Sequence, residues 1–248
     1  MERVMIVTGG SRGIGAEVAL LAASRGYCVA VNFTANRGAA DQVVARIEQA
    51  GGRALAVRAD VALEADVVQM FETVDRTLGV VTALVNNAGV VDFSSRVRDM
   101  SVARLNRMFG INVIGSFLCA REAIKRMSTA TGGPGGAIVN VSSAAARLGS
   151  PGEYVDYAAS KGAIDTFTLG LARELAGEGI RVNAVRPGLI ETEIHASGGQ
   201  PGRVDRIKSA IPMQRGGHAI EVAHAILWLL SEESSYVTGS LVDVSGGR

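Results

Sequence analysis

Short apolar runs, rich in β-branched residues, alternate along this chain with longer stretches of helical periodicity. The runs are almost continuously apolar and do not alternate with polar residues, which is typical of parallel strands covered by helices on both faces. Repeated strand–helix units with right-handed crossovers favour a doubly wound sheet. The sequence therefore predicts an α/β fold with about seven mainly parallel strands. They are expected at residues 3–9, 27–33, 53–61, 82–89, 136–143, 180–188 and 239–247.

The helical stretches include residues 15–25, a long stretch around 101–127, and one from about 153 to 177. Residues 128–137 are rich in glycine and predict a simple connector. Residues 191–217 are rich in glycine and proline and have weak periodicity, and loops of this length are usually lids or binding loops. With 248 residues and 48% hydrophobic content, the chain can form one core. We expect a single domain over residues 1–248 with a substrate lid around 191–215.

Composition narrows the possible partners and the compartment. The net charge of +1 gives no indication of a nucleic acid or an anionic membrane as partner. No apolar run approaches the roughly 20 residues that span a bilayer, and the N-terminus lacks a signal-peptide pattern. Cys28 and Cys119 lie in apolar or helical runs, which predicts buried free thiols and a cytoplasmic location. The spacing of His195, His218 and His224 suggests no metal site.

The segment "TGGSRGIG" (8–15) closes the first predicted strand and opens the first predicted helix. Gly9, Gly13 and Gly15 have the spacing G-x-x-x-G-x-G. Glycines here let the backbone turn tightly and approach a pyrophosphate, which then lies at a positive helix N-terminus. A merely tight turn is the alternative. The position after the first strand of an α/β chain favours phosphate binding in a Rossmann-like fold.

The second predicted strand bears on which dinucleotide binds. Sites for NAD usually carry an Asp or Glu about 20 residues past the glycines, but no acid occurs between Tyr27 and Ala40. Arg12 and Arg37 can each offer a guanidinium to a 2′-phosphate. Alternatively, both arginines are solvated surface groups. We expect a preference for NADP(H), with NAD(H) possible.

Six motifs fall in an order and spacing that resemble one family. They are "TGGSRGIG" (8–15), "NNAG" (86–89), Asn112, "IVNVSS" (138–143), "YAASK" (157–161) and "RPG" (186–188). Over essentially its whole length the chain resembles the classical short-chain dehydrogenase/reductases, in the branch of 3-ketoacyl-carrier-protein reductases and bacterial glucose dehydrogenases. The resemblance implies an oxidoreductase that interconverts a carbonyl and an alcohol by hydride transfer with a nicotinamide cofactor.

The resemblance also implies the catalytic residues. Tyr157 would be the general acid/base, and Lys161, one helical turn away, would lower the pKa of its phenol and bind the nicotinamide ribose. An isolated pair of this kind would be ordinary helix surface. Ser143 would bond the substrate oxygen, with Ser142 structural, and Asn112 would hold a water for proton relay. Tyr154 lacks a lysine four residues on and is expected to line the substrate pocket or to pack.

The same resemblance assigns cofactor contacts just beyond the carboxyl ends of the strands. They begin in the glycine-rich loop and pass through the ends of the second, third and fourth strands to the turn that would meet the carboxamide. The set is Gly9, Ser11, Arg12, Gly13, Ile14, Gly15, Thr34, Asp60, Val61, Asn87, Ala88, Gly89, Tyr157, Lys161, Pro187, Gly188, Ile190 and Thr192.

The final predicted strand resembles the edge through which family members form tetramers, so a homotetramer is expected. Two other functions remain open: a dinucleotide-binding regulator that has lost catalysis, and an epimerase or dehydratase of the same family. The substrate is expected to be a small molecule, but the pocket residues select no class. The candidates there are Ser94, Arg147, Tyr154, Ile194 and His195.

Overall fold

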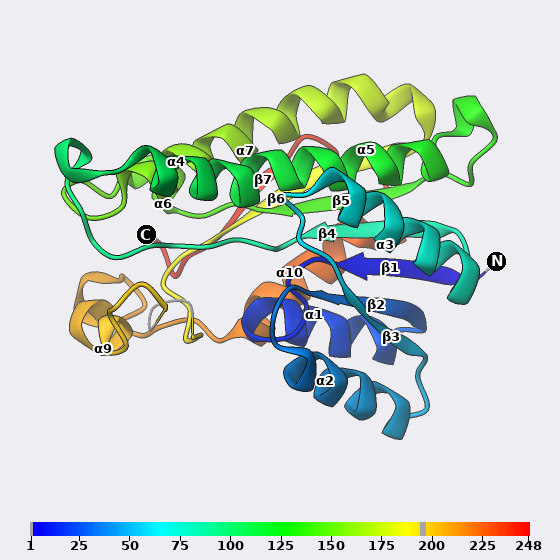
Figure 1. The fold of residues 1–248 in the computed structure, drawn as a ribbon, viewed down its shortest axis with the longest axis horizontal. Coiled ribbons are helices and arrows are strands. Elements are labelled where there is room, and N and C mark those ends of the chain that lie inside the picture. Colours follow the sequence, from blue (N-terminus) through cyan, green and yellow to red (C-terminus); the bar gives the residue numbers. More distant parts are fainter. Residues whose placement is uncertain (1, 194–196) are drawn as a thin grey trace.

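The computed structural model describes residues 2–193 and 197–248. Within them, seven strands form one sheet in the order β3-β2-β1-β4-β5-β6-β7. Every neighbouring pair is parallel, which confirms the predicted doubly wound α/β sheet (Figure 1). The strands are β1 (Arg3–Val7), β2 (Tyr27–Phe33), β3 (Ala54–Arg58), β4 (Val81–Asn86), β5 (Gly136–Val141), β6 (Ile180–Pro187) and β7 (Leu241–Val244).

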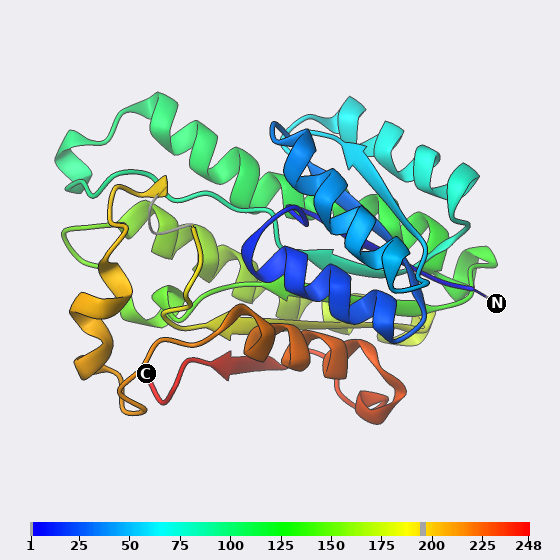
Figure 2. The ribbon, with the colours of Figure 1, turned by 90° about the horizontal axis from the view of Figure 1, so that it is seen from below.

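Helices cover both faces of the sheet. One layer contains α1, α2 and α10, with α1 packed closely against α10, and the other contains α3, α4, α5 and α7 (Figures 1 and 2). The helices are α1 (Gly13–Ser24), α2 (Arg37–Gln49), α3 (Glu64–Thr77), α4 (Val102–Phe109), α5 (Gly115–Met127), α6 (Ala145–Leu148), α7 (Val155–Leu175), α9 (Arg203–Ile207) and α10 (Ala219–Leu230).

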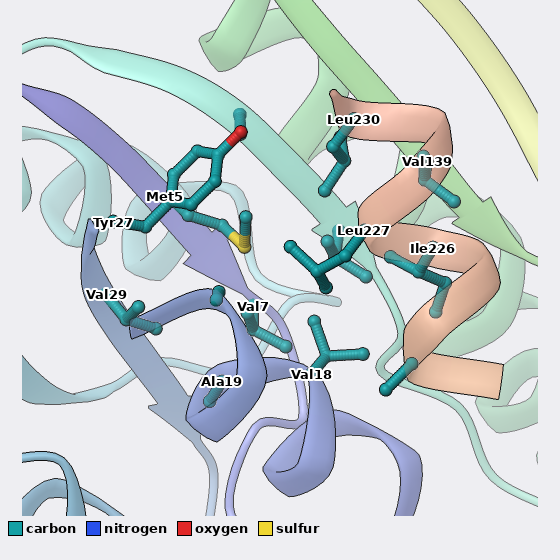
Figure 3. Packing of buried hydrophobic residues seen from close by; sticks show 14 of the residues in the cluster. Met5, Val7, Val18, Ala19, Tyr27, Val29, Val139, Ile226, Leu227 and Leu230 are labelled. Atoms are coloured by element: carbon teal, nitrogen blue, oxygen red, sulfur yellow. The ribbon is translucent and has the colours of Figure 1, made fainter. Parts of the chain in front are cut away.

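Two apolar cores follow from the pleat of the strands. Along β1, Met5 and Val7 belong to the cluster under α1 and α10, whereas Val4 and Ile6 belong to the cluster under α3 and α5. Figure 3 shows the first cluster, in which Met5 and Val7 lie near helix side chains such as Val18. Burial of each such side chain contributes about 1.5–3 kcal/mol, so apolar residues on both faces of a strand stabilise the sheet from both sides.

The stretch 101–127, predicted to be helical, is not one regular helix. A π-helical turn over Gly110–Ile114 separates α4 from α5. Asn112 lies in this turn and is 1% exposed. Its carboxamide oxygen accepts a hydrogen bond from the amide of Val90 at 2.8 Å. The side chain is therefore held by the loop after β4, and such single-turn widenings are frequent at functional sites.

Cys28 and Cys119 are buried free thiols, as predicted. Burial raises the pKa of Cys119 to about 12, with a smaller contribution from Glu122. Among residues 2–193 and 197–248, no three His, Cys, Asp or Glu side chains gather as metal ligands. No helix in these ranges is long and apolar enough to cross a membrane.

Candidate active site

The loops after β1 and β4 meet where the strand order reverses, between these two neighbours. The Asn87 side chain donates to the carbonyls of Thr8 and Gly9 at 2.9 and 3.0 Å. The Thr8 hydroxyl accepts from the amides of Asn87 and Ala88 at 2.9 and 3.0 Å. Open α/β sheets bind ligands at such a reversal. Here these hydrogen bonds join the two loops, which together form the rim of the site at the carboxyl ends of the strands.

The glycine-rich loop is packed too tightly to admit side chains at key positions. Gly9 and Gly13 have φ values of +60° and +53°, a region that favours glycine. At Gly15, a Cβ atom would lie 2.4 Å from the carbonyl oxygen of Gly9 and 2.6 Å from Nδ2 of Asn87. Helix α1 then begins at Gly13, and its N-cap, Arg12, makes no side-chain capping bond. The first amides of α1 are thus available to an anion.

Asn32, which the sequence analysis did not single out, fixes the start of this loop. It is 1% exposed, and its Oδ1 accepts from the amide of Gly9 at 3.1 Å. Its Nδ2 donates to the carbonyls of Val57 and Ala59 at 3.3 and 3.0 Å. One amide side chain therefore ties β2 and β3 to the β1 loop. A polar residue inside an otherwise apolar strand was the sequence signal.

The ends of β2 and β3 form the far side of the rim. Thr34 and Arg37 are exposed, and Arg37 pairs with Asp41 at 3.4 Å. Arg58, which the sequence analysis missed, donates through Nε to the Thr34 carbonyl at 3.2 Å. A second guanidinium thus lies at this end.

Asp60 shapes the turn after β3, where the next two predicted cofactor contacts lie. Its Oδ1 accepts from the amide of Ala62 at 3.0 Å, while Val61 beside it is buried. The turn is therefore held by the Asp60 side chain itself.

Ser143 and Tyr157 face each other beyond the end of β5. Burial raises the pKa of Tyr157, and the hydrogen bond with the Ser143 side chain offsets part of that rise. Ser142 is different: it is 2% exposed, and its hydroxyl donates to the carbonyl of Lys161 at 3.1 Å. The two adjacent serines therefore occupy distinct environments, one turned to the tyrosine and one bound to the backbone of α7.

Lys161 is 4% exposed, and its Nζ lies 5.7 Å from the centre of the Tyr157 ring. The Nζ donates to the Val141 carbonyl at 2.7 Å. Burial lowers the pKa of Lys161 to about 8, and Asp165 opposes that change. The spacing of the motif predicts that Lys161 lowers the pKa of Tyr157, but burial dominates in this arrangement and the pKa is raised. The ammonium is engaged by a β5 carbonyl, which the spacing of the motif could not reveal.

Asn112 connects the π-helical turn to the helix that carries Tyr157. Its Nδ2 donates to the Val90 carbonyl at 3.0 Å and to the Ser160 hydroxyl at 3.1 Å. Ser160 in turn donates to the backbone carbonyl of Tyr157 at 2.7 Å. Asn112 therefore holds the start of α7 against the β4 loop. Ser160 is a second link that the sequence analysis missed.

A cavity of about 380 Å³ brings many of the predicted residues together. Those lining it are Ile14, Asn87, Gly89, Ser143, Tyr157, Lys161, Pro187, Gly188, Ile190 and Thr192. Tyr154, Glu153, Arg203 and Arg248 also line it. Outside its lining are Asn112 and the remaining expected cofactor contacts, namely Gly9, Ser11, Arg12, Gly13, Gly15, Thr34, Asp60, Val61 and Ala88.

The predicted pocket residues do not all lie in this cavity. Tyr154 lines the cavity, whereas Ser94 is exposed outside it. Arg147 lines a neighbouring cavity, where it pairs with Asp243 at 3.2 Å. Ile194 and His195 lie outside the described residues.

Part of the expected lid contacts the start of α7. Arg203, in α9, forms an ion pair with Glu153 at 2.6 Å, and its guanidinium lies 5.1 Å from the centre of the Tyr154 ring. Gln200 donates to the Tyr154 hydroxyl at 2.7 Å. Helix α9 lies beyond the carboxyl ends of the strands (Figure 1), so these contacts close one side of the cavity.

Comparison with known proteins gives consistent matches along the chain. Residues 9–248 match a family described as "Enoyl-(Acyl carrier protein) reductase". The chain is 60% identical over 245 residues to "Uncharacterized oxidoreductase YgfF" of Escherichia coli, covering 99% of each. It is 36% identical to "Glucose 1-dehydrogenase 2" of Bacillus subtilis, covering 99% of this chain and 94% of that protein. A solved mutant of a short-chain dehydrogenase/reductase from Serratia marcescens superposes with a TM-score of 0.91 at 33% identity. That match covers 99% of this chain and 97% of the other.

Proposed function

Since this chain belongs to the classical short-chain dehydrogenase/reductases, we propose that it is an NADP(H)-dependent enzyme that interconverts a carbonyl and an alcohol. One observation carries the proposal: Ser143, Tyr157 and Lys161 line one cavity next to the glycine-rich loop. A hydroxyl, a phenol and an ammonium are thereby gathered where a carbonyl oxygen can be bound and protonated.

The residues present fit a dinucleotide. The backbone at Gly15 leaves no room for a Cβ, and the uncapped first turn of α1 presents amide donors for a pyrophosphate. Asn87, Gly89 and Thr192 continue this surface toward the cavity. When bound, NADP(H) supplies or accepts the hydride, and the remaining steps belong to the protein.

In the direction of reduction, Tyr157 donates its proton to the substrate oxygen. Its raised pKa keeps the phenol protonated at neutral pH, so the residue starts as an acid. Ser143 donates a hydrogen bond that steadies the developing alkoxide. Lys161, whose pKa is about 8, is mostly an ammonium at pH 7 and favours the phenolate that remains. In oxidation the same groups act in reverse.

The preference for NADP(H) is tested at the adenosine end. Replacing Arg12 and Arg37 together by alanine should raise the KM for NADPH by about 10- to 100-fold, because charge-assisted bonds to a phosphate contribute about 1.5–3 kcal/mol. The KM for NADH, which lacks the phosphate, should change about twofold or less. Steady-state kinetics with both cofactors gives the answer. Arg46→Ala, an exposed arginine of α2, is the matched control. Equal efficiency of the unaltered enzyme with NADH would refute the preference.

The reaction class is tested by following NADPH oxidation with a panel of ketones, aldehydes, sugars and ketoacyl thioesters. Two of the matches bear on the panel, because the matched family is described by an acyl-carrier-protein substrate and one relative is a glucose dehydrogenase. A catalytically inactive regulator would bind NADPH but would not oxidise it with any substrate of the panel. An epimerase or dehydratase would convert its substrate without net consumption of the cofactor.

We also propose that residues 191–215 act as a substrate lid on a single domain of residues 1–248. The ion pair of Arg203 with Glu153 and the bond of Gln200 to Tyr154 connect this segment to the cavity wall. A small carbonyl compound is the partner that such a cavity suits. The buried free thiols of Cys28 and Cys119 and the net charge of +1 support a cytoplasmic enzyme without a nucleic-acid or membrane partner.

A homotetramer is proposed from two surfaces of the described chain. Strand β7 is an edge strand, and exposed apolar side chains lie on α5 (Phe117), on α7 (Leu169) and at the end of the π-helical turn before α5 (Ile114). On the same helices, Phe117 stacks on Phe167 with ring centres 3.8 Å apart. We expect light scattering to give the mass of four chains. Phe117→Glu should halve that mass, since a charge in an apolar interface is costly. An unaltered protein that is monomeric would exclude this assembly.

A further inference from the structure

Asp165 is the third of three ionisable side chains at regular spacing along α7. Tyr157, Lys161 and Asp165 are spaced four residues apart, so their side chains follow one another on one side of the helix. We propose that Asp165 is a positioning residue that helps Tyr157 and Lys161 to retain their protons, with Arg186 limiting its influence. This inference rests on the proposed function and adds a residue to its machinery.

The Asp165 carboxylate is buried and unevenly bonded. Its Oδ2 accepts from Nε and Nη2 of Arg186 at 3.0 and 2.8 Å. Its Oδ1 is buried without a hydrogen-bond partner among the described residues. The two side chains are 11% and 15% exposed. Because little water surrounds the pair, solvent screens the carboxylate weakly, and its field reaches the neighbouring ammonium.

Three other carboxylates near α7 and the cavity are paired with arginines, and two further arginines lie nearby. Asp156 on α7 pairs with Arg104 of α4 at 2.7 Å. On the side of α6 and the lid, Arg147 pairs with Asp243 at 3.2 Å and Arg203 with Glu153 at 2.6 Å. From β6, Arg181 donates to the carbonyls of Leu229 and Ser231, and Arg248 lines the cavity. Asp165 is the acid that raises the pKa of Lys161 against its burial, so it is the carboxylate with the closest bearing on the site.

The direction of the effect does not depend on which group loses its proton first. The Lys161 Nζ lies 5.7 Å from the centre of the Tyr157 ring, and at this distance a change of charge on one group bears on the pKa of the other. A negative charge nearby opposes removal of a proton from either group, and a positive charge assists it. Removing the charge of Asp165 must therefore lower the first apparent pKa of the pair. Removing the charge of Arg186 must raise it.

Both reaction directions then shift in the same sense. Reduction needs the phenol proton together with the Lys161 ammonium, so the alkaline limb of its pH profile follows the first apparent pKa of the pair. Oxidation needs the phenolate beside that ammonium, a state reached only when the pair has lost one proton, so the acid limb of its profile follows the same pKa. A change in the Asp165–Arg186 pair therefore moves the alkaline limb of the reduction profile and the acid limb of the oxidation profile. Both limbs move toward the same side of the pH scale.

The experiment compares the pH profiles of kcat for the unaltered enzyme, Asp165→Asn, Arg186→Met and the double variant. We expect Asp165→Asn to move the limb down by about one pH unit and Arg186→Met to move it up. In the double variant the limb should lie close to that of the unaltered enzyme. Asp165→Glu keeps the charge, so its limb should also lie close to that of the unaltered enzyme. Lower kcat values with unmoved limbs would show a merely structural role and overturn the inference.

A second readout does not require turnover. The phenolate absorbance of Tyr157, taken as the difference between each protein and the same protein with Tyr157→Phe, should shift with pH in the same directions. Thermal denaturation reports which variants fold. If Asp165→Asn does not fold, the upward shift of the phenolate titration expected for Arg186→Met tests the inference. An unmoved phenolate titration would overturn the role of Asp165 alone. Full activity of Tyr157→Phe would instead overturn the proposed function.

Discussion

Replacing Tyr157 with phenylalanine should lower kcat by about 10³-fold, within the range that general acid–base catalysis contributes. The ring that lines the cavity is kept, and only the hydroxyl that faces Ser143 is removed. Substrate binding and the packing of α7 should therefore survive, while the proton donor is lost. The Kd for NADPH, measured by cofactor fluorescence, should change by about threefold or less, since the dinucleotide surface is formed mainly by backbone.

Tyr154→Phe is the matched control for this result. Tyr154 lines the same cavity, but its hydroxyl accepts a bond from Gln200 and lies beside Arg203 of the lid, whose guanidinium is 5.1 Å from the ring centre. Loss of that hydroxyl should change KM more than kcat, because it alters how the lid is held and leaves the proton donor in place. Similar kcat losses in both variants would mean that Tyr157 has no special role.

The second large effect is expected at Gly15. Gly15→Ala places a methyl group 2.4 Å from the Gly9 carbonyl oxygen and 2.6 Å from Nδ2 of Asn87, so the loop must move. Overpacking of this kind typically costs about 1–3 kcal/mol of stability. The displaced atoms belong to the rim where the β1 and β4 loops are joined. We therefore expect the Kd for NADPH to rise by about 100-fold or more, since close backbone approach is what the pyrophosphate requires.

Gly177→Ala controls for the general effect of adding a methyl group. A Cβ at Gly177 would meet nothing within 4 Å, so stability and NADPH affinity should stay close to those of the unaltered protein. Fluorescence titration and thermal denaturation of both variants give the comparison. If Gly15→Ala binds NADPH as tightly as Gly177→Ala does, the glycine-rich loop is not the phosphate-binding surface.

The sheet could be predicted from the sequence because its strands are buried on both faces. Runs such as "RVMIV" in β1 (Arg3–Val7) are apolar after their first residue, and such runs have few other stable environments. The prediction for β1 ends two residues too late. Residues 8 and 9 belong to the loop in which Gly9 takes a φ of +60°. The apolar pattern alone does not reveal this change of backbone conformation.

The break in the helix 101–127 was not predictable from periodicity. The π-helical turn spans five residues, Gly110–Ile114, and the apolar pattern resumes directly afterwards in α5. The cause lies elsewhere in the chain, because Val90 in the β4 loop bonds both ends of the Asn112 carboxamide. Sequence spacing cannot show a contact between residues 22 positions apart.

For the site, residue types could be predicted but electrostatics could not. The motif brings Ser143, Tyr157 and Lys161 to one cavity. Whether the pKa of Tyr157 is raised or lowered depends on its burial and on the position of the Lys161 amine. Here that amine donates to the Val141 carbonyl. Arg58 was missed because its relation to Thr34 arises from the pairing of two strands.

The widened turn at Gly110–Ile114 has a consequence for how this protein tolerates changes in chain length. Each residue of a regular helix advances the side chains by about 100°, so deleting one residue there would rotate the whole of α4 relative to α5. The Arg104–Asp156 pair, at 2.7 Å, would then be broken at a distance from the deletion. Homologous chains should therefore keep constant length across this helix.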